Sequence, residues 1–152
     1  EYYLHRDFSK NSQYSGIPFM DHESQDISSN YIIYAHNMKD GSMFADLLKY
    51  EDKSFYDSHS TIIFDDLYER GEYQILGVFT TKVGADNEFR YHDYANITDG
   101  EKFSEYIKKV KELSCYDTGI TAEYGDKLIT LSTCAYHTSN ERFVVVAKKI
   151  IK

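Results

Sequence analysis

The sequence has no tryptophan, one proline and two cysteines, and no apolar run approaches the roughly 20 residues that a membrane-spanning helix needs. Two cysteines cannot form a disulfide framework, so the 152 residues must be held by a hydrophobic core, which a chain of this length can build. Lys and Arg number 17 against 25 Asp and Glu, a balance that argues against a phosphate-binding surface. We therefore expect one globular domain, residues 1–152, without a nucleic-acid partner.

Aromatic residues are abundant instead, with 15 Tyr and 9 Phe. Both residue types favour strands and bury large areas. Seven segments have the β-branched and aromatic composition of strands: 16–21, 30–36, 61–66, 72–83, 119–124, 127–134 and 142–151. Short strands at this close spacing favour an antiparallel-rich sheet that closes, or nearly closes, into a barrel. The predicted fold class is therefore mainly β.

One long helix is predicted over residues 98–115, where apolar residues recur on a single stripe. Thr98 and Glu101 have the spacing of a capping box, which places the start of the helix at Thr98. Two short peripheral helices are expected at 42–50 and 53–59. The segment 89–94 is ambiguous between an extended segment and a loop.

Cys134 ends the predicted strand 127–134 and is followed by a polar stretch. A cysteine in an apolar strand is commonly a small buried hydrophobe. However, a strand end beside a polar loop is also where functional side chains gather. Cys115 falls at a predicted helix end, and a disulfide between the two cysteines remains an alternative.

Arg142 opens the strand that follows Cys134. If the two strands form an antiparallel hairpin, both residues lie at its adjoining ends, where a guanidinium would favour a thiolate and stabilise an oxyanion. The plainer alternative is an arginine that pairs with Glu141 or with solvent. Among six histidines, His36 stands at a strand end and suits proton donation to a leaving amine; the others lie in polar, loop-like segments.

Metal-binding patterns are missing from the sequence. The cysteines and histidines show neither C-x-x-C nor H-x-x-x-H spacing, and there is no glycine-rich phosphate loop. We therefore expect neither a metal site nor a cofactor.

Several segments resemble class B sortases, and the likeness runs over essentially the whole chain. In order they are YLHRDF (3–8), SGIPFMD (15–21), YAHNMKDGSMF (34–44), SFYDSH (54–59), TLSTC (130–134) and ERFVVVAK (141–148). The most specific element is TLSTC followed by an arginine that opens a Val-rich strand. The resemblance implies a sortase-type closed β-barrel of seven to eight strands.

The same resemblance implies a Cys–His–Arg site at one rim, formed by Cys134, His36 and Arg142. Ser132 occupies the position at which the family contacts its sorting peptide. Leu4, Phe89 and Tyr91 match groove-lining regions more loosely, and the two aromatic residues can equally belong to the core. One departure is Ala135, where some class B sortases carry an acidic residue after the nucleophile.

The implied activity is that of a cysteine transpeptidase. It would cut a C-terminal sorting signal of secreted proteins through a thioester and join the new end to an amine of a cell-wall peptidoglycan precursor. The implied location is the outer face of the membrane of a Gram-positive bacterium, with an N-terminal anchor and first segment that we expect to be missing from this chain. A cysteine hydrolase of similar fold and a non-catalytic peptide-binding β-domain are the alternatives.

Overall fold

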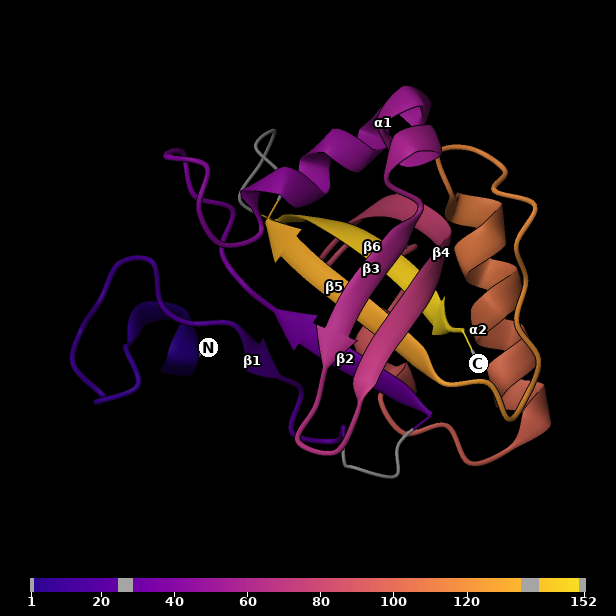
Figure 1. Cartoon of the computed structure of the whole chain (residues 1–152), viewed down its shortest axis with the longest axis horizontal. Coiled ribbons are helices and arrows are strands. Elements are labelled where there is room, and N and C mark those ends of the chain that lie inside the picture. The colour runs from indigo at the N-terminus through magenta and orange to yellow at the C-terminus, as the bar shows by residue number, and fades with distance from the viewer. Residues whose placement is uncertain (1, 25–28, 135–139, 151–152) are drawn as a thin grey trace.

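The computed structural model describes residues 2–24, 29–134 and 140–150, with Cys134 described by its backbone. Its centre is a curled sheet of six described strands in the order β1-β2-β5-β6-β4-β3 (Figure 1). The strands are β1 (Phe19–Met20), β2 (Asn30–Tyr34), β3 (Thr61–Asp65), β4 (Arg70–Lys82), β5 (Leu128–Cys134) and β6 (Glu141–Lys149). Of the described pairs, β2 with β5 is parallel and the other four are antiparallel.

The curl of the sheet brings its two ends towards each other. The rings of Tyr31 on β2 and Phe64 on β3 lie 6.2 Å apart, although three strands separate β2 from β3 in the sheet order. The strands β2 and β3 are not hydrogen-bonded neighbours, so the described sheet is a half-barrel. The predicted mainly β fold is confirmed, whereas closure by seven to eight strands is not.

The predicted strand at 119–124 was wrong. Local hydrogen bonds occupy the backbone there: Gly119 N donates to Asp117 Oδ1, and Ile120 N donates to Thr118 Oγ1. Side chains that satisfy nearby amides compete with the ladder of a sheet. Ile120 nevertheless packs against the core, which explains why the segment has the apolar composition of a strand.

Short helices surround the sheet. They are the 3₁₀ helices η1 (Tyr2–His5), η2 (Ala45–Glu51) and η3 (Tyr91–Tyr94) and the α-helices α1 (Lys53–Ser58) and α2 (Gly100–Leu113). The ambiguous segment at 89–94 thus contains a 3₁₀ turn, and η2 takes the place of the first predicted short helix. No helix in the described ranges is both long and apolar enough to cross a bilayer.

Helix α2 covers one face of the sheet through a buried stripe of Phe103, Tyr106, Ile107 and Val110. It begins later than predicted, because Asp99 is the N-cap and accepts a hydrogen bond from Lys102 N at 2.8 Å. Its close approach to β4 depends on Gly77, where an added Cβ would lie 2.6 Å from Val110 Cγ1.

The strands β5 and β6 divide the core into two layers. Alternating residues of a strand face opposite sides of a sheet. Val144 and Val146 face the layer under α2, while Phe143, Val145 and Ala147 face the layer beneath η2 and α1. Because both faces of β6 are buried, residues 143–147 are all apolar in the sequence.

Candidate functional site

Sheet register brings the three predicted site positions to one end of the sheet. Tyr34 at the end of β2 pairs with Ser132 on β5, and Cys134 at the end of β5 pairs with Arg142 on β6. His36 follows Tyr34 by two residues, as Cys134 follows Ser132. The backbones of residues 36, 134 and 142 therefore meet at one rim, although the first lies far from the other two along the chain.

His36 is half-buried and is held by the N-terminal segment. Its Nε2 lies 2.6 Å from the carbonyl oxygen of Leu4. Its ring lies 5.3 Å from the ring of His5 and 6.4 Å from that of Tyr14, the latter nearly parallel at 6°. The histidine that the sequence singles out is thus fixed at the rim by contacts from residues 4 to 14.

Arg142 is half-buried at the start of β6. Its Nη1 donates to the carbonyl oxygen of Glu141 at 3.0 Å. The Glu141 carboxylate, which the sequence suggested as its partner, instead lies 3.9 Å from Lys82 Nζ. Arg142 lines the adjoining pocket.

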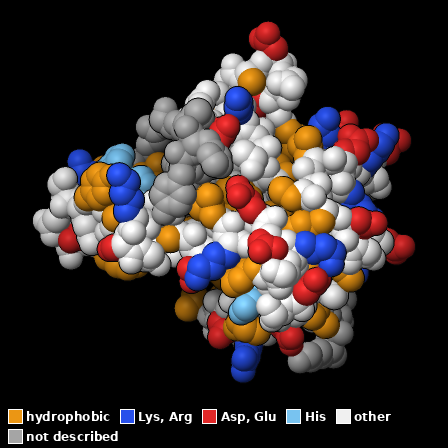
Figure 2. Space-filling view, turned by 90° about the horizontal axis from the view of Figure 1, so that it is seen from above, with side chains coloured by type: hydrophobic (Ala, Val, Ile, Leu, Met, Phe, Trp, Pro, Cys, Tyr) orange, Lys and Arg blue, Asp and Glu red, His pale blue; other side chains and the backbone are white. Residues whose placement is uncertain are grey.

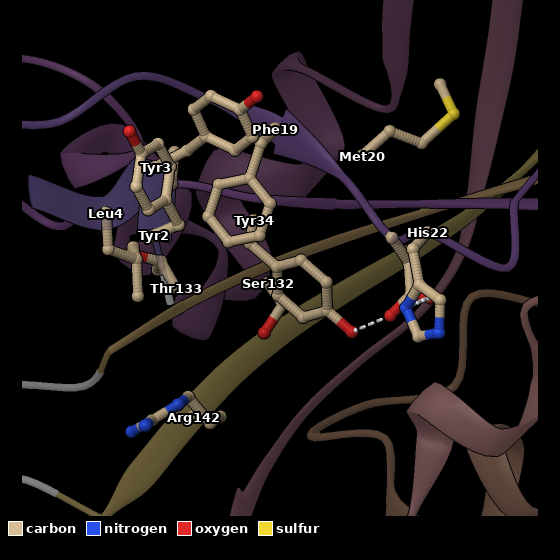
Figure 3. Close-up of a pocket in the computed structure, with 12 residues that line it drawn as sticks. Tyr2, Tyr3, Leu4, Phe19, Met20, His22, Tyr34, Ser132, Thr133 and Arg142 are labelled. Carbon is tan, nitrogen blue, oxygen red and sulfur yellow. Dashed lines mark hydrogen bonds and ion pairs between the residues drawn. The ribbon is translucent and has the colours of Figure 1, made fainter. Parts of the chain in front are cut away.

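That pocket has a volume of about 440 Å³ and is mostly apolar (Figure 3). Figure 3 shows Arg142 on one side and Met20 with His22 on the other, with aromatic rings between them. The lining residues are Tyr2, Tyr3, Leu4, Phe19, Met20, Asp21, His22, Tyr34, Ala35, Ser132, Thr133 and Arg142. A pocket of this size, with largely apolar walls and an arginine in its lining, suits a short peptide that presents a backbone carbonyl to the guanidinium.

The predicted substrate-contact residues fall into two groups in the structure. Leu4 and Ser132 line the pocket, and the buried Ser132 hydroxyl is hydrogen-bonded to the Tyr91 hydroxyl at 2.6 Å. Phe89 and Tyr91 are 7% and 4% exposed and belong to the core layer under α2. The structure gives these two rings a packing role, and their assignment as groove-lining residues stays a prediction.

Sequence reasoning missed Tyr34 and Asp21 on the pocket wall. The Tyr34 hydroxyl donates to Asp21 Oδ2 at 2.7 Å. Burial raises the pKa of Tyr34, and the Asp21 carboxylate raises it further, so the phenol stays neutral and its hydroxyl stays directed at Asp21. Tyr34 lies two residues before His36, so an extended strand places both side chains on the same face, and this spacing could have identified Tyr34 from the sequence. The position of Asp21 depends on pairing by the two-residue strand β1, which is too short to recognise from sequence.

The two cysteines are not joined. Cys115 is a free thiol just after α2. Partial burial raises its pKa, and the nearby Glu51 carboxylate adds to this effect, so Cys115 is poorly suited to act as a thiolate nucleophile. The side chain of Cys134 lies outside the described part of the structure.

Comparison with known proteins identifies the family of this chain. The sortase domain family matches residues 3–150. The chain belongs to the sortase family. Sortase B of Listeria monocytogenes is 36% identical over 156 residues, covering 100% of this chain and 61% of the relative. Sortase B of Staphylococcus aureus is 34% identical over 152 residues, covering 97% and 60%. The chain thus spans about three fifths of the length of these curated relatives.

Solved sortase B structures share the fold of this sortase domain. A Staphylococcus aureus sortase B–substrate complex superposes with a TM-score of 0.85 at 29% identity, covering 98% of this chain and 68% of that one. A sortase B complexed with triglycine gives 0.84 at 29% identity, covering 97% and 69%. The resemblance to class B sortases is therefore confirmed.

Proposed function

We propose that this sortase domain is a cysteine transpeptidase whose site consists of Cys134, His36 and Arg142. The thiolate of Cys134 attacks the carbonyl carbon of a peptide bond in a sorting signal. His36 donates its proton to the departing amine as the C–N bond breaks, which leaves a thioester. An incoming amine then attacks the thioester, gives a proton to His36 and releases the thiolate.

Arg142 acts on the carbonyl oxygen in this scheme. Negative charge develops on that oxygen as each tetrahedral intermediate forms, and charged hydrogen bonds from a fixed guanidinium stabilise it. The partial burial of Arg142 strengthens such bonds, because water competes less for the guanidinium.

The observation that carries the proposal is the register of β2, β5 and β6. The strands β2 and β5 end, and β6 begins, at the rim where positions 36, 134 and 142 lie, beside a pocket that Arg142 lines. Support comes from the relatives, which are sortase B enzymes, one solved as a substrate complex and one as a complex with triglycine. A thiol, an imidazole and a guanidinium can together supply the nucleophile, the proton carrier and the oxyanion donor of acyl transfer.

The proposed substrates are a C-terminal sorting signal of a secreted protein and an amine of a cell-wall peptidoglycan precursor. The pocket accepts the peptide, with Ser132 and Leu4 at its wall. The proposed location is the outer face of the membrane of a Gram-positive bacterium, by way of an N-terminal anchor that would precede residue 1.

The test is incubation of the domain with a sorting peptide and an added glycine peptide, followed by mass spectrometry. The proposal predicts a ligated product that disappears in Cys134→Ala. Hydrolysed peptide without ligation at saturating amine would identify a cysteine hydrolase. Peptide binding with neither product would identify a non-catalytic binding domain.

A further inference from the structure

Residues 2–17 form a small lobe beside the sheet. Figure 1 shows it projecting at the left, next to β1, and Figure 2 shows hydrophobic and histidine side chains gathered at the same end. Its backbone is held by hydrogen bonds from Gln13 N to His5 O and from Ile17 N to Tyr3 O. Tyr2, Tyr3 and Leu4 of this lobe line the pocket, and the proposed chemistry leaves the rest of the lobe without a role.

The contact between the lobe and His36 fixes the position of a hydrogen. A backbone carbonyl oxygen can only accept a hydrogen bond, so the 2.6 Å contact between Leu4 O and His36 Nε2 requires hydrogen on Nε2. In neutral His36, Nδ1 is then the unprotonated nitrogen. It is Nδ1 that can take up or release a proton during the reaction.

Gly16 holds the same carbonyl group in place. It is buried, with φ of +58°, and an added Cβ would lie 2.3 Å from Leu4 O and 2.5 Å from Leu4 C. No side chain fits there without displacing the group that bonds His36. Gly16 therefore allows the turn and the close approach together.

Two rings of the lobe complete the surroundings. The ring of His5 lies 5.3 Å from that of His36, and the ring of Tyr14 lies parallel to it at 6.4 Å. Both rings restrict how far the His36 imidazole can turn about its side-chain bonds. Both residues are exposed on the lobe, so their substitution should leave the core intact.

We propose that the lobe, residues 2–17, is a positioning element for His36. The Leu4 carbonyl selects the Nε2–H form, Gly16 sets the carbonyl, and the rings of His5 and Tyr14 hold the imidazole plane. This inference rests on the proposed function only in so far as His36 transfers a proton; the selection of one tautomer stands without it.

The direct test is nuclear magnetic resonance of ¹⁵N-histidine-labelled protein, with the His36 signals assigned by their loss in His36→Gln. The wild type should show Nε2–H. Gly16→Ala should lose this preference and lower kcat by about tenfold or more, because small misplacements of a catalytic group have effects of this size. Gly84→Ala is the matched control, since Gly84 also has positive φ, at +81°, but has open space around its Cβ position.

A second set of variants keeps the claim testable if Gly16→Ala fails to fold. His5→Ala should lower kcat severalfold with KM unchanged, and His5→Phe should restore it because the ring contact returns. Phe8→Ala on the same lobe, 85% exposed, is the control expected to match the wild type.

Two results would overturn the proposal: an Nδ1–H signal for wild-type His36, or wild-type kcat in both Gly16→Ala and His5→Ala. Failure of the proposed function looks different. In that case the wild type forms no acyl product, or His36→Gln retains activity, while the tautomer signature of the wild type is still observed.

Discussion

Arg142 differs from the other arginines by its place at the rim, opposite Cys134 and beside the pocket. We expect Arg142→Lys to lower kcat by about 100-fold, since a single ammonium cannot reproduce the planar set of donors that faces the developing oxyanion. Steady-state kinetics on a sorting peptide measure the effect. Arg90→Lys is the control, because Arg90 forms an exposed ion pair with Asp93. Near-normal turnover of Arg142→Lys would remove Arg142 from the mechanism.

At the scale of single residues, the sequence predicted the three residues of the proposed site but only part of the pocket beside them. That prediction depended on the resemblance to class B sortases as well as on the predicted strand ends, and sheet register brings the backbones of these residues to one rim. Tyr34 and Asp21 meet only through the register of β1 with β2, a tertiary property. Ser132 lines the pocket, and its contact with a sorting peptide stays a prediction; its bond to Tyr91 could not be predicted from residues 41 positions apart.

Among the elements, the start of α2 is the clearest difference between sequence and structure. Asp99→Ala should lower the free energy of unfolding by about 1 kcal/mol, because the Asp99 carboxylate satisfies an otherwise unpaired amide of the first turn. Thr98→Ala, the change that a capping box would make costly, should stay within about 0.5 kcal/mol. Urea denaturation of the two variants measures both values. A larger loss in Thr98→Ala than in Asp99→Ala would contradict the assignment.

The packing of α2 on β4 gives a second prediction for an element. Gly77→Ala should lower the free energy of unfolding by about 1–3 kcal/mol, since the new methyl group overlaps Val110. Adding Val110→Ala should recover part of this loss, so the two changes should be non-additive in a double-mutant cycle.

Gly100→Ala is the control for Gly77→Ala. The nearest atoms to its added Cβ are carbons of Tyr124 at 3.7 Å or more, an ordinary contact, so no loss of stability is expected. Equal losses in Gly77→Ala and Gly100→Ala would show that close packing is not the cause.

Helices and strands whose sequence has one clear hydrophobic pattern were predictable. Segments in which side chains form hydrogen bonds with the nearby backbone were not. The strands β5 and β6 and the helix α1 agree closely with their predicted segments. At 119–124, Asp117 and Thr118 take the backbone amides that a strand would use. At 42–50, the chain forms the 3₁₀ helix η2 instead, starting at Ala45. At 119–124 the apolar pattern reflects the packing of Ile120 against the core, and at 42–50 it reflects the buried Leu47, while Met43 and Tyr124 are exposed.

For the whole molecule, buried tyrosines make stability depend on pH. Desolvation raises the pKa of Tyr73 and of Tyr94 to about 12, and burial also raises that of Tyr106. Tyrosines of the unfolded chain release protons near pH 10. Between about pH 10 and 12 the folded state therefore binds more protons, and its stability falls as pH rises through this window.

We expect the melting temperature to be steady from about pH 8 to 9.5 and to fall above about pH 10, where unfolded tyrosines ionise. Differential scanning calorimetry across this range measures it, and Tyr73→Phe should reduce the slope because one shifted group is removed. A melting temperature that is flat to about pH 11, or an unchanged slope in Tyr73→Phe, would contradict this account.

The charge of the molecule also has a consequence at this scale. The formal net charge is −8, and the face in Figure 2 shows acidic and basic side chains intermingled. Arg142 places a positive charge beside a mostly apolar pocket, in a chain whose net charge is negative. In the proposed mechanism this guanidinium binds the carbonyl oxygen of the peptide.

The central claim is that the sulfur of Cys134 becomes acylated by a peptide at the rim of the sheet. The most direct measurement is rapid acid quench of the protein with a sorting peptide, then proteolysis and mass spectrometry to locate the thioester. The account predicts acyl mass on the peptide that contains Cys134, its absence in Cys134→Ala, and unchanged labelling in Cys115→Ala. Acylation of Cys115, or turnover by Cys134→Ala, would contradict it.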